Sequence, residues 1–419
     1  MDRPKVFGNF VNGAWTEGEG EYANTNPSDT RDVIGRYARA TQKQAADAIG
    51  AAHAAFPAWA LSTPQQRFDA LDAVGSEILA RKAELGDLLA REEGKTLPEA
   101  IGEVARAAYI FKFFAGEALR IPGEVVQSVR PGVGVEMTRE PLGVVAIITP
   151  WNFPIAIPAW KIAPALCYGN TVVFKPAELV PGSAWALAEI VSRCGLPPGV
   201  FNLVMGKSSE IGEALLTDAR IAAITFTGSQ AIGRRVAQAA IGGMKKFQLE
   251  MGGKNPLVVL DDANLEVAVN CAVQGGFFST GQRCTASSKV IATAGIHDRF
   301  VQAVVDKMKA LKIDDARKKG TDIGPVVSVL RAKNYEEALA WANDTDMGLS
   351  SGICTTSLKY ASHFKRHAQA GMVMVNLPTA GVDYHVPFGG RKGSSYGPRE
   401  QGRYAAEFYT TVKTAYTLP

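Results

Sequence analysis

The amino-acid sequence predicts an α/β protein of two domains, and three observations support this fold class. The chain has 419 residues, of which 47% are hydrophobic and 21% charged, so it holds enough apolar material for a large core. From residue 143 onward, short apolar strands alternate with helical segments, which is the pattern of a parallel sheet with crossover helices. A second series of strands and helices begins after Glu250, which places a domain boundary near that residue.

The first third of the chain supplies elements around the first sheet. Residues 7–40 contain short alternating apolar segments broken by turn residues, which predicts hairpins at a domain edge. Residues 42–114 show apolar positions at helical spacing, which predicts helices that cover one face of the sheet. The Pro-Gly pair at 122–123 ends this run, and residues 124–138 are predicted to be an extended arm that pairs with another subunit.

Two series of strands follow this arm. The predicted strands span residues 144–148, 171–174, 201–204 and 222–226 in the first series, and 257–260, 289–292 and 372–376 in the second, with a helix over 265–278. Open α/β sheets bind ligands at the carboxyl ends of their strands, so polar residues directly after these strands are candidate site residues.

The composition and charge exclude several kinds of partner. The net charge of +4 comes from 45 basic and 41 acidic residues that are scattered along the chain, so no nucleic-acid or membrane-binding surface is expected. No apolar run reaches the roughly 18 residues of a membrane span. The five cysteines lie far apart, and neither they nor the five histidines show metal-ligand spacing, which predicts no metal and a reducing, cytoplasmic location.

The segment Thr149-Pro150-Trp151-Asn152 follows the first buried strand. The side-chain amide of Asn152 could donate a hydrogen bond to charge that develops on a carbonyl oxygen, and the neighbouring prolines would stiffen the turn. The alternative is an asparagine that only closes a tight turn.

The segment Lys175-Pro176-Ala177-Glu178 follows the second strand and could hold ribose hydroxyls. A carboxylate at Glu178 would repel a 2′-phosphate, which favours NAD over NADP. The alternative is a surface ion pair between Lys175 and Glu178.

The segment Phe226-Thr227-Gly228-Ser229 follows the fourth strand and leads into a helix that contains Ile232. Backbone amides at a helix N-terminus can bind a pyrophosphate. The alternative is a strand that simply turns into a helix capped by a serine.

The stretch from 248 to 288 contains a candidate base, Glu250, and a candidate nucleophile, Cys284. A thiol attacks carbonyl carbon as its thiolate, and Cys284 follows a polar loop with a glycine and a cation at Arg283. Cys167 and Cys271 lie in apolar settings and are expected to be inert. Taken alone, Glu250 could be a surface carboxylate, and the pair does not exclude a chemistry like that of thiol proteases.

In combination, and in this order along the chain, these motifs resemble the aldehyde dehydrogenase superfamily; Leu249-Glu250-Met251-Gly252-Gly253-Lys254, Gly281-Gln282-Arg283-Cys284 and Pro387-Phe388-Gly389-Gly390 extend the match over nearly the whole chain. The resemblance implies a Rossmann-type NAD(P)-binding domain at 1–120 and 141–249 and an α/β catalytic domain at 250–403. It also implies bridging elements for oligomerisation at 121–140 and 404–419, and hence a homodimer or homotetramer.

The resemblance assigns a role to each candidate residue. Cys284 would form a thiohemiacetal with an aldehyde, Asn152 and the Cys284 amide would form the oxyanion hole, and Glu250 would activate the water that hydrolyses the thioester. The expected cofactor is NAD, with NADP as the alternative. The residues that would bind it are Thr149, Pro150, Trp151, Lys175, Pro176, Ala177, Glu178, Phe226, Thr227, Gly228, Ser229 and Ile232.

Within the superfamily, residues 160–166, 387–395 and 399–402 look most like bacterial 2-oxoglutarate semialdehyde dehydrogenases. We therefore expect Arg283 to bind the distal carboxylate of the substrate, with Asn152 and Trp160 beside it, because a guanidinium matches a carboxylate bidentately. The alternative roles for Arg283 are contact with solvent or support of the thiolate. The alternative substrates are succinate semialdehyde, glutarate semialdehyde or a neutral aldehyde, and an inactive binding or structural subunit is the alternative of another class.

The chain departs from the family pattern near residue 328. The family usually carries, before the strand predicted at 372–376, a long stretch that ends in Glu-x-Phe-Gly-Pro, whose glutamate holds the nicotinamide ribose. Here several tens of residues are missing, and the segment 324–328, Gly-Pro-Val-Val-Ser, resembles the family at both edges of the gap.

Two explanations for this gap compete. A stretch could be omitted from the sequence, which would explain how core strands keep their partners. A true deletion between two similar segments would explain the resemblance at both edges, and it would loosen nicotinamide binding. We favour the deletion, and an intact mass well above 44.6 kDa would contradict it.

Overall fold

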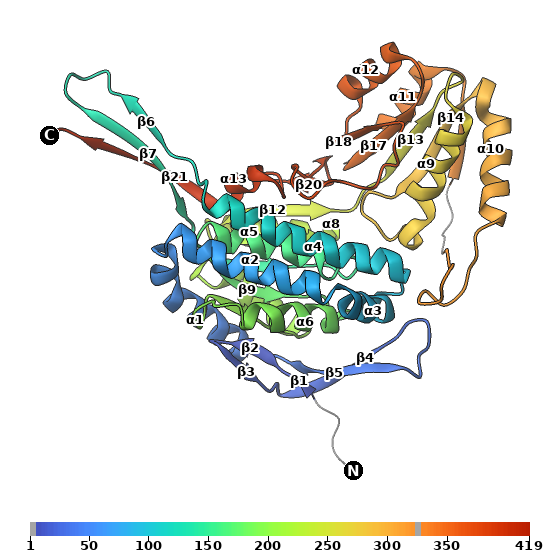
Figure 1. Cartoon of the computed structure of the whole chain (residues 1–419). Helices are drawn as coiled ribbons and strands as arrows, with labels where there is room; N and C mark the ends of the chain where they lie inside the picture. Colours follow the sequence, from blue (N-terminus) through green and yellow to red (C-terminus); the bar gives the residue numbers. More distant parts are fainter. Residues whose placement is uncertain (1–5, 323–327) are drawn as a thin grey trace.

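An eight-stranded sheet forms the centre of the larger domain (Figure 1). The computed structural model describes residues 6–322 and 328–419. The order of the strands in this sheet is β20-β12-β11-β8-β9-β10-β2-β3. The strands are β8 (Val144–Ile148), β9 (Thr171–Lys175), β10 (Phe201–Leu203), β11 (Ile221–Gly228), β12 (Lys246–Met251), β20 (Ser395–Tyr396), β2 (Asn9–Val11) and β3 (Ala14–Thr16).

The five central strands, from β12 to β10, run parallel. β8 and β9 consist almost wholly of buried residues, because helices cover both faces of a parallel sheet. Successive side chains of β8 enter different hydrophobic clusters: Val145 and Ile147 join one, and Val144 and Ala146 the other. The predicted strands of this series are confirmed within a few residues at their ends.

Helices form two layers around this sheet (Figure 1). The first cluster is packed by α2 (Pro64–Ala80), α3 (Lys82–Glu93), α4 (Leu97–Ala118), α5 (Ala156–Cys167) and α6 (Pro181–Ser192). The second is packed by α1 (Gln42–Ala60), α7 (Ser208–Thr217) and α8 (Gln230–Gly242). The helical prediction for residues 42–114 is confirmed as four separate helices, α1 to α4.

The direction of the strand order reverses between β8 and β11. The chain leaves β8 for β9 on one side, whereas β11 and β12 lie on the other side. In open α/β sheets, this reversal opens a crevice at the carboxyl ends of the two strands. The segments beginning at Thr149 and Ser229 therefore emerge side by side at one edge of the sheet.

A five-stranded parallel sheet forms the smaller domain, in the order β15-β14-β13-β17-β18. Its strands are β13 (Asn255–Val259), β14 (Ser287–Thr293), β15 (Ser328–Ala332), β17 (Ser350–Cys354) and β18 (Met372–Val375). One face is covered by α9 (Leu265–Phe277) and α10 (Ala294–Lys309), and the other by α11 (Tyr335–Asn343) and α12 (Leu358–His367).

The gap in the family pattern lies between α10 and β15, and residues 323–327 are outside the described part of the chain. β15 pairs with β14 over its full length, so the described strands of this domain all have partners. The expectation that a deletion would leave core strands unpaired is therefore wrong for these strands. The chain therefore passes from β14 through α10 to β15 as it would between two neighbouring parallel strands.

Several short elements complete the body. β1 (Val6–Phe7), β4 (Gly20–Thr25) and β5 (Val33–Arg39) form a three-stranded sheet at its base, and β2 with β3 forms the predicted edge hairpin. β16 (Met347–Gly348) pairs with β19 (Arg391–Lys392). The helix α13 (Ala406–Tyr409) and the 3-10 turn η2 (Arg403–Ala405) lead into the C-terminal strand.

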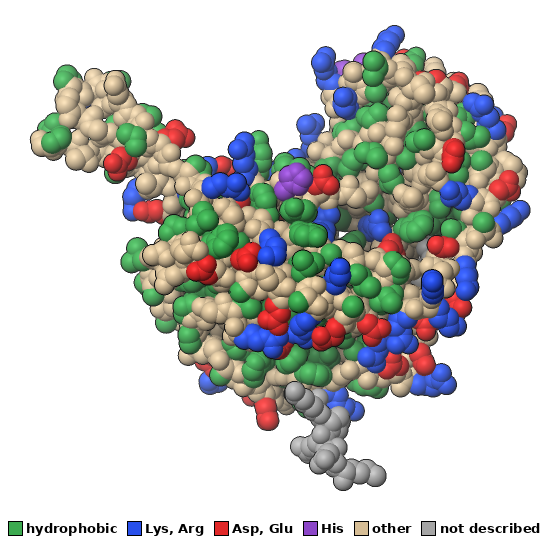
Figure 2. All heavy atoms as spheres, viewed as in Figure 1, with side chains coloured by type: hydrophobic (Ala, Val, Ile, Leu, Met, Phe, Trp, Pro, Cys, Tyr) green, Lys and Arg blue, Asp and Glu red, His purple; other side chains and the backbone are tan. Residues whose placement is uncertain are grey.

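An arm projects from the body and consists of β6 (Glu124–Gln127), β7 (Gly134–Pro141) and the C-terminal β21 (Thr410–Thr417) (Figure 1). The extended prediction for 124–138 is confirmed. Hydrophobic side chains lie on the surface of the arm (Figure 2), including Val125, Val129 and Tyr416, which are 81%, 102% and 61% exposed.

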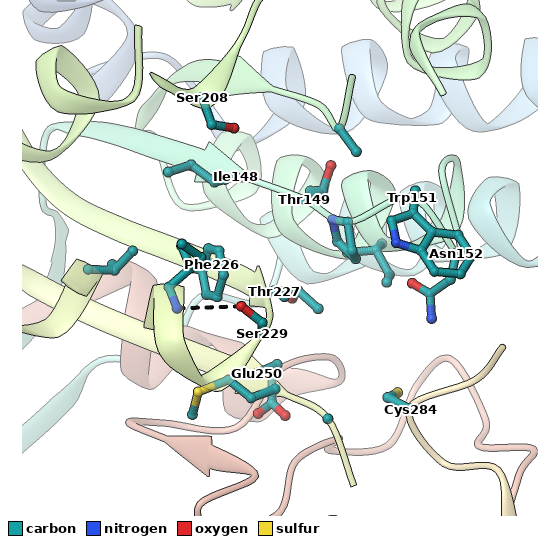
Figure 3. A pocket seen from close by; sticks show the side chains of 18 of the residues that line it. Ile148, Thr149, Trp151, Asn152, Ser208, Phe226, Thr227, Ser229, Glu250 and Cys284 are labelled. Atoms are coloured by element: carbon teal, nitrogen blue, oxygen red, sulfur yellow. Dashed lines mark hydrogen bonds between the residues drawn. The ribbon is translucent and has the colours of Figure 1, made fainter. Parts of the chain in front are cut away.

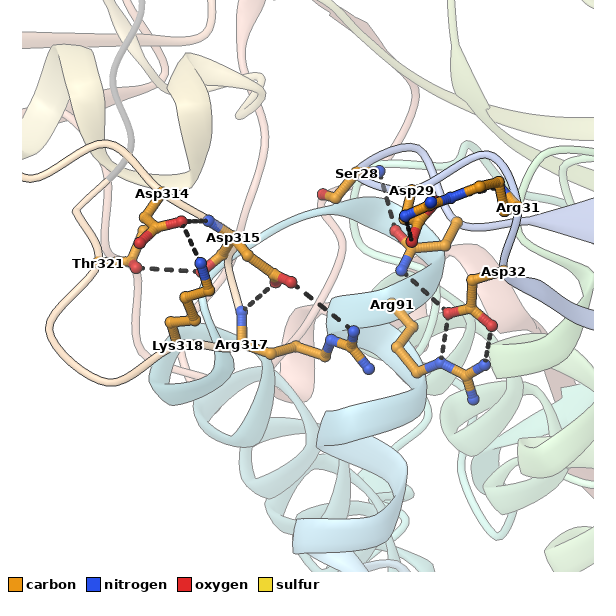
Figure 4. A network of polar contacts seen from close by, with 11 residues as sticks. Ser28, Asp29, Arg31, Asp32, Arg91, Asp314, Asp315, Arg317, Lys318 and Thr321 are labelled. Atoms are coloured by element: carbon orange, nitrogen blue, oxygen red, sulfur yellow. Dashed lines mark hydrogen bonds and ion pairs between the residues drawn. The ribbon is translucent and has the colours of Figure 1, made fainter.

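The two domains also meet away from the site (Figure 4). The amide of Leu97 donates to the carbonyl of Ala316 at 3.1 Å, so the loop after α10 lies at the start of α4. Arg31 and Arg91 lower the pKa of Asp29 and Asp32, respectively, and the charge of Arg317 adds to both effects. The positive charge of Arg317 in this loop is therefore attracted to the carboxylates of Asp29 and Asp32 on the larger domain.

Candidate active site

A cavity of about 920 Å³ lies at the junction of the two domains (Figure 3). It receives residues from the carboxyl ends of β8, β9, β11 and β12 and from the loop before β14. The predicted site residues that line it are Thr149, Pro150, Trp151, Asn152, Trp160, Lys175, Ala177, Glu178, Phe226, Thr227, Gly228, Ser229, Ile232, Glu250, Arg283 and Cys284. Pro176 is the exception, and its carbonyl accepts a hydrogen bond of 3.0 Å from the Lys175 ammonium.

Cys284 lies in the loop between the 3-10 turn η1 (Phe278–Gly281) and β14. The side chain of Asn255 fixes this loop, because its amide donates to the carbonyl of Cys284 at 2.7 Å and to that of Ala286 at 2.8 Å. The same side chain accepts from the amide of Ser350 at 3.0 Å. One buried asparagine thus joins the cysteine loop to two strands of the catalytic sheet.

Gly253 allows the chain after Glu250 to approach this loop. A Cβ atom at Gly253 would lie 2.8 Å from the Cys284 carbonyl oxygen and 2.6 Å from Oδ1 of Asn255. Because backbone cannot move aside as a flexible side chain can, only glycine fits here.

The surroundings of Cys284 favour its protonated thiol. Burial, together with the carboxylates of Glu250 and Glu400, raises the pKa of Cys284 to about 12. The backbone amides of Cys284 and Thr285 act in the opposite direction. A reaction at this thiol therefore requires a group that removes its proton.

Asn152 points toward Cys284 across the cavity (Figure 3). One of its two amide hydrogens is donated to the Gln282 carbonyl at 2.9 Å, which leaves the other for a ligand. Its backbone is held by the buried ammonium of Lys95, which donates to the Asn152 carbonyl at 3.0 Å and to Glu103 at 2.7 Å. The turn that carries Asn152 is therefore held in place by the buried Lys95. An asparagine whose only role was to close the turn would not need this support.

Glu103 anchors the same turn through its other oxygen. Oε1 accepts from the amides of Ile155 and Ala156 at 3.0 and 3.1 Å, at the start of α5. A carboxylate at a helix N-terminus satisfies free N–H groups and interacts favourably with the helix dipole.

Glu250 lies at the end of β12 and is only 3% exposed, so the alternative of a surface carboxylate is wrong. Its pKa is raised well above the usual value by burial and by the nearby carboxylate of Glu400. The hydroxyl of Ser395, on the neighbouring β20, donates to its Oε2 at 2.5 Å and acts in the opposite direction.

A buried ion pair lies beneath Glu250. The ammonium of Lys161 donates to the carboxylate of Glu400 and, at 2.7 Å, to the hydroxyl of Thr225. The side chains of Lys161 and Glu400 are 0% and 1% exposed. The charge of Lys161 lowers the pKa of Glu250, whereas that of Glu400 raises it, so this pair tunes the candidate base.

Sequence reasoning missed these supporting residues. Lys161 had a usable signal, because it is a lone charge within the apolar run of α5 and must have a buried partner. Lys95, Glu103, Asn255 and Glu400 lie in segments without such contrast, and their partners are far away in the sequence.

The strand ends on the other side of the cavity suit an anionic ligand with hydroxyl groups. The buried hydroxyls of Thr149 and Thr227 have no hydrogen-bond partner in the described structure, and they follow or end the two strands at the crevice. Ser229 caps α8 by accepting from the Ile232 amide at 3.4 Å, and both residues line the cavity. A strand that simply turns into a capped helix would not explain why the buried hydroxyls of Thr149 and Thr227 lack partners. These two hydroxyls therefore favour a ligand site.

Lys175 and Glu178 do not form an ion pair with each other among the described residues, so that alternative is wrong. Burial lowers the pKa of Lys175 to about 8. Glu178 accepts a hydrogen bond of 2.7 Å from the amide of Ser208, and both residues line the cavity.

Arg283 lines the cavity, but its guanidinium has a partner. It forms an ion pair of 2.7 Å with Glu99, at the first turn of α4, and donates to the hydroxyl of Ser279 at 3.1 Å. The same oxygen of Glu99 accepts from the Ser279 amide at 2.9 Å. These contacts fix the turn before Cys284, and binding of a substrate carboxylate by Arg283 stays a prediction.

Two properties of the described chain bear on the kind of site. The described residues contain no group of three or more His, Cys, Asp or Glu side chains that could hold a metal ion. Within the same part of the chain, no helix has the length and hydropathy needed to cross a membrane.

Comparison with known proteins identifies the family. The model described as "Aldehyde dehydrogenase family" matches residues 15–328 and 323–415. The two matched stretches overlap at 323–328, so this short segment is similar to the family at two separate places, as the sequence indicated.

The curated relatives match over almost their whole length. An alpha-ketoglutaric semialdehyde dehydrogenase of Bacillus subtilis (strain 168) is 37% identical over 477 residues, which cover 98% of each chain. A 2,5-dioxopentanoate dehydrogenase of Saccharolobus solfataricus is 35% identical, covering 96% of this chain and 97% of the relative. The aligned length of 477 exceeds the 419 residues of this chain, so at least 58 positions of the Bacillus relative face a gap.

Solved structures show the same fold. A betaine aldehyde dehydrogenase from Staphylococcus aureus in complex with NAD+ superposes with a TM-score of 0.95 at 28% identity, covering 98% of this chain and 94% of that one. An NADP dependent enzyme of E. coli also gives 0.95, at 29% identity, covering 99% and 98%. The predicted fold class is confirmed. The chain belongs to the aldehyde dehydrogenase family.

Proposed function

We propose that this protein oxidises an aldehyde to a carboxylate with NAD, through a thiohemiacetal and a thioester on Cys284. The observation that carries the proposal is that Cys284, Asn152 and Glu250 line one cavity together with the strand ends at the crevice between β8 and β11. A nucleophile, a hydrogen-bond donor and a base thus face a site suited to a dinucleotide.

The residues of the chain divide the acyl chemistry among them. The Cys284 thiol loses its proton to solvent and its sulfur adds to the aldehyde carbon, and the oxygen that gains charge accepts hydrogen bonds from the free amide hydrogen of Asn152 and from the Cys284 backbone N–H. Bound NAD would supply the acceptor for the hydride of that carbon, and loss of the hydride leaves a thioester on Cys284. Glu250 then removes a proton from the water that attacks the thioester, and the product acid and the free thiol result.

The electrostatics of the site suit this division. Burial raises the pKa of Glu250, and a carboxylate with a raised pKa is a stronger base near neutral pH than an exposed one. The raised pKa of Cys284 keeps its thiol protonated until a base takes the proton, which limits its side reactions in the free protein.

NAD is the proposed cofactor rather than NADP. Thr149, Thr227 and the first turn of α8 offer donors for a pyrophosphate and its ribose, and Glu178 places a carboxylate at the same end of the cavity. A carboxylate accepts hydrogen bonds from free ribose hydroxyls but repels a 2′-phosphate.

The proposed substrate is 2-oxoglutarate semialdehyde. The support is the similarity over nearly the whole chain to relatives named for this substrate, one from Bacillus subtilis and one from Haloferax volcanii, each 37% identical. Succinate semialdehyde is the alternative named for more distant relatives, such as one of Arabidopsis thaliana at 33% identity.

The gap near residue 328 affects one step of the proposed reaction, the oxidation that requires the nicotinamide. The family's glutamate for the nicotinamide ribose is absent from this sequence, whereas the thiol, the amide and the base remain. We expect weak retention of the nicotinamide end and slow oxidation, with thioester hydrolysis intact. Intact mass spectrometry tests the deletion itself, with 44.6 kDa as the expected value.

The experiment that tests the proposal is NADH formation, followed by absorbance, with 2-oxoglutarate semialdehyde as substrate. Cys284→Ser should abolish the rate, because the hydroxyl is a far weaker nucleophile. Cys194→Ser is the matched control, since Cys194 is a half-buried thiol on the larger domain that lies outside the cavity, and it should leave the rate unchanged.

Two results would contradict parts of the proposal. If the wild-type protein forms no NADH with any aldehyde, yet releases p-nitrophenol from p-nitrophenyl acetate in a Cys284-dependent way, the acyl chemistry stands and the oxidation does not. If neither reaction occurs, the inactive binding or structural subunit is the correct reading.

We also propose that the arm of β6, β7 and β21 pairs with a second copy of this chain. The arm carries exposed hydrophobic side chains, including Val125 and Val129, and a long edge strand of this kind is usually covered. Light scattering after size-exclusion chromatography should give a dimer or tetramer, and a chain that ends before β21 should be monomeric.

A further inference from the structure

A second arginine lies near Cys284 and differs from Arg283 in its surroundings. Arg106 is on α4, and its guanidinium lies over the indole of Trp160, 5.9 Å from the ring centroid. It donates to the carbonyl of Val382 and, at 3.0 Å, to Oε1 of Gln401. Both acceptors are neutral.

The charge of Arg106 is not compensated by an ion pair in the described part of the chain. Burial lowers the pKa of Arg106, and Glu103, Asp383 and Cys284 are near enough to act in the opposite direction. Its Nε is buried and has no hydrogen-bond partner. A guanidinium has five N–H donors, so three of them are free at Arg106.

Trp160 adds a donor beside it. Its indole nitrogen is also buried without a partner, although Trp160 lines the cavity that holds Cys284. The ring stacks on Phe388 with centroids 5.5 Å apart, and Phe388 lines the same cavity. Two neighbouring side chains therefore carry unused buried donors: Trp160, which lines the cavity of Cys284, and Arg106, which lies over the Trp160 ring and outside that lining.

Unused buried donors of this kind cost free energy unless a ligand pairs with them. Leaving a buried donor unpaired is unfavourable, and burying a guanidinium without an anion is more so. The Nε of Arg283 is also buried without a partner, but the charge of Arg283 is paired with Glu99 at 2.7 Å, and the Ser279 hydroxyl accepts a further hydrogen bond from it. Of the two arginines near the thiol, Arg106 is the one whose charge is free for an anion.

We propose that Arg106 and Trp160 together bind the carboxylate and the adjacent oxo group of a 2-oxo acid semialdehyde, and that Arg106 rather than Arg283 gives the site its preference for an acidic aldehyde. The inference rests on the proposed function for the reaction, but the binding of an anion beside Cys284 can be measured without turnover. The planar fork of the guanidinium matches a carboxylate, and the indole N–H fits the neighbouring carbonyl oxygen.

The first test compares two alkylating agents at Cys284. Iodoacetate carries a carboxylate and iodoacetamide does not, so the ratio of their rates reports an anion site next to the sulfur. Mass spectrometry of the Cys284 peptide gives each rate. Arg106→Met should lower the iodoacetate to iodoacetamide ratio by about tenfold or more, the effect of losing a charge-assisted hydrogen bond.

The controls separate this role from general charge and from folding. Lys112→Met removes a cation from the same helix, where it pairs with Asp72, and should leave the ratio unchanged. Arg106→Lys keeps the charge but loses the fork, so it should give an intermediate ratio if Arg106→Met fails to fold. An Arg106→Met or Arg106→Lys ratio equal to that of the wild type would overturn the inference.

The second test uses substrates. In wild-type protein that forms NADH, Arg106→Met should lower kcat/KM for 2-oxoglutarate semialdehyde by about tenfold or more relative to pentanal. Trp160→Phe, which keeps the ring but removes the N–H, should lower kcat/KM for 2-oxoglutarate semialdehyde relative to glutarate semialdehyde. An unchanged substrate preference in both variants would overturn the inference. A wild-type protein that forms no NADH would contradict only the proposed function, and the alkylation ratio would then decide whether Arg106 binds an anion beside Cys284.

Discussion

The buried pair of Lys161 and Glu400 offers a sharp test of how the site is supported. Glu400→Gln keeps the shape of the side chain and removes its charge, which leaves the ammonium of Lys161 with the Thr225 hydroxyl as its other partner. Both side chains are almost fully inaccessible to water, at 0% and 1% exposure. Removing one partner of such a pair costs about 3–5 kcal/mol of unfolding free energy, because the remaining charge is buried and uncompensated.

The double variant should behave differently. Lys161→Met with Glu400→Leu removes both charges and leaves apolar groups of similar size, a change that is often neutral or stabilising by about 1–4 kcal/mol. We therefore expect each single variant to be less stable than the double one. Urea unfolding followed by circular dichroism gives the four free energies of this double-mutant cycle.

The same variants should move the activity in opposite directions on the pH axis. The Glu400 carboxylate raises the pKa of Glu250, so Glu400→Gln lowers that pKa and shifts the acid limb of thioester hydrolysis to lower pH. The Lys161 ammonium lowers the pKa of Glu250, so Lys161→Met shifts the limb to higher pH. If both limbs move the same way, or if each single variant loses less than about 1 kcal/mol of stability, our account of this pair is refuted.

Three further predictions concern the residues around the cavity. Asn255→Ala removes the hydrogen bonds to the carbonyls of Cys284 and Ala286 and the one from the Ser350 amide. Urea unfolding should therefore show that the free energy of unfolding falls by about 2–4 kcal/mol. A fall of less than about 0.5 kcal/mol would contradict the anchoring role of Asn255. Glu250→Gln should slow thioester hydrolysis by about 10²–10⁴-fold. The same substitution should speed alkylation of Cys284 by iodoacetamide at mildly alkaline pH, because the pKa of Cys284 falls once the Glu250 carboxylate no longer raises it; slower alkylation would reverse the sign. Glu178→Gln retains an acceptor for the Ser208 amide but removes the negative charge. The ratio of kcat/KM with NADP to kcat/KM with NAD should therefore rise about fivefold to tenfold, the effect of removing about 1 kcal/mol of repulsion. An unchanged ratio would exclude Glu178 from cofactor choice.

The sequence was most informative where local pattern and packing agree. Buried parallel strands such as β8 and β9 are continuous apolar runs, so their positions follow from composition and length. The residues at or just past their carboxyl ends, including Lys175 and Asn152, were predictable for the same reason, since the carboxyl ends of neighbouring strands must share one edge.

The rest depends on contacts between distant segments. Nothing near Arg106 in the sequence shows that its guanidinium meets Val382 and Gln401 rather than an acid. In the same way, Arg283 looked free for a substrate because its partner Glu99 is 184 residues away. A side chain's charge can be read from the sequence, but whether that charge is already neutralised is a property of the folded chain.

The pairing of β20 with β12 has a consequence for when the protein becomes competent during synthesis. Ser395 reaches Glu250 from 145 residues further along the chain, and Glu400 reaches Lys161 from 239 residues away. The base, its hydroxyl donor and its buried cation are therefore assembled only when residues 395–400 have emerged from the ribosome and docked. A chain released before β20 is made would contain the nucleophile Cys284 without its finished base. The pairing of β20 with β12 is therefore the last step in forming the site.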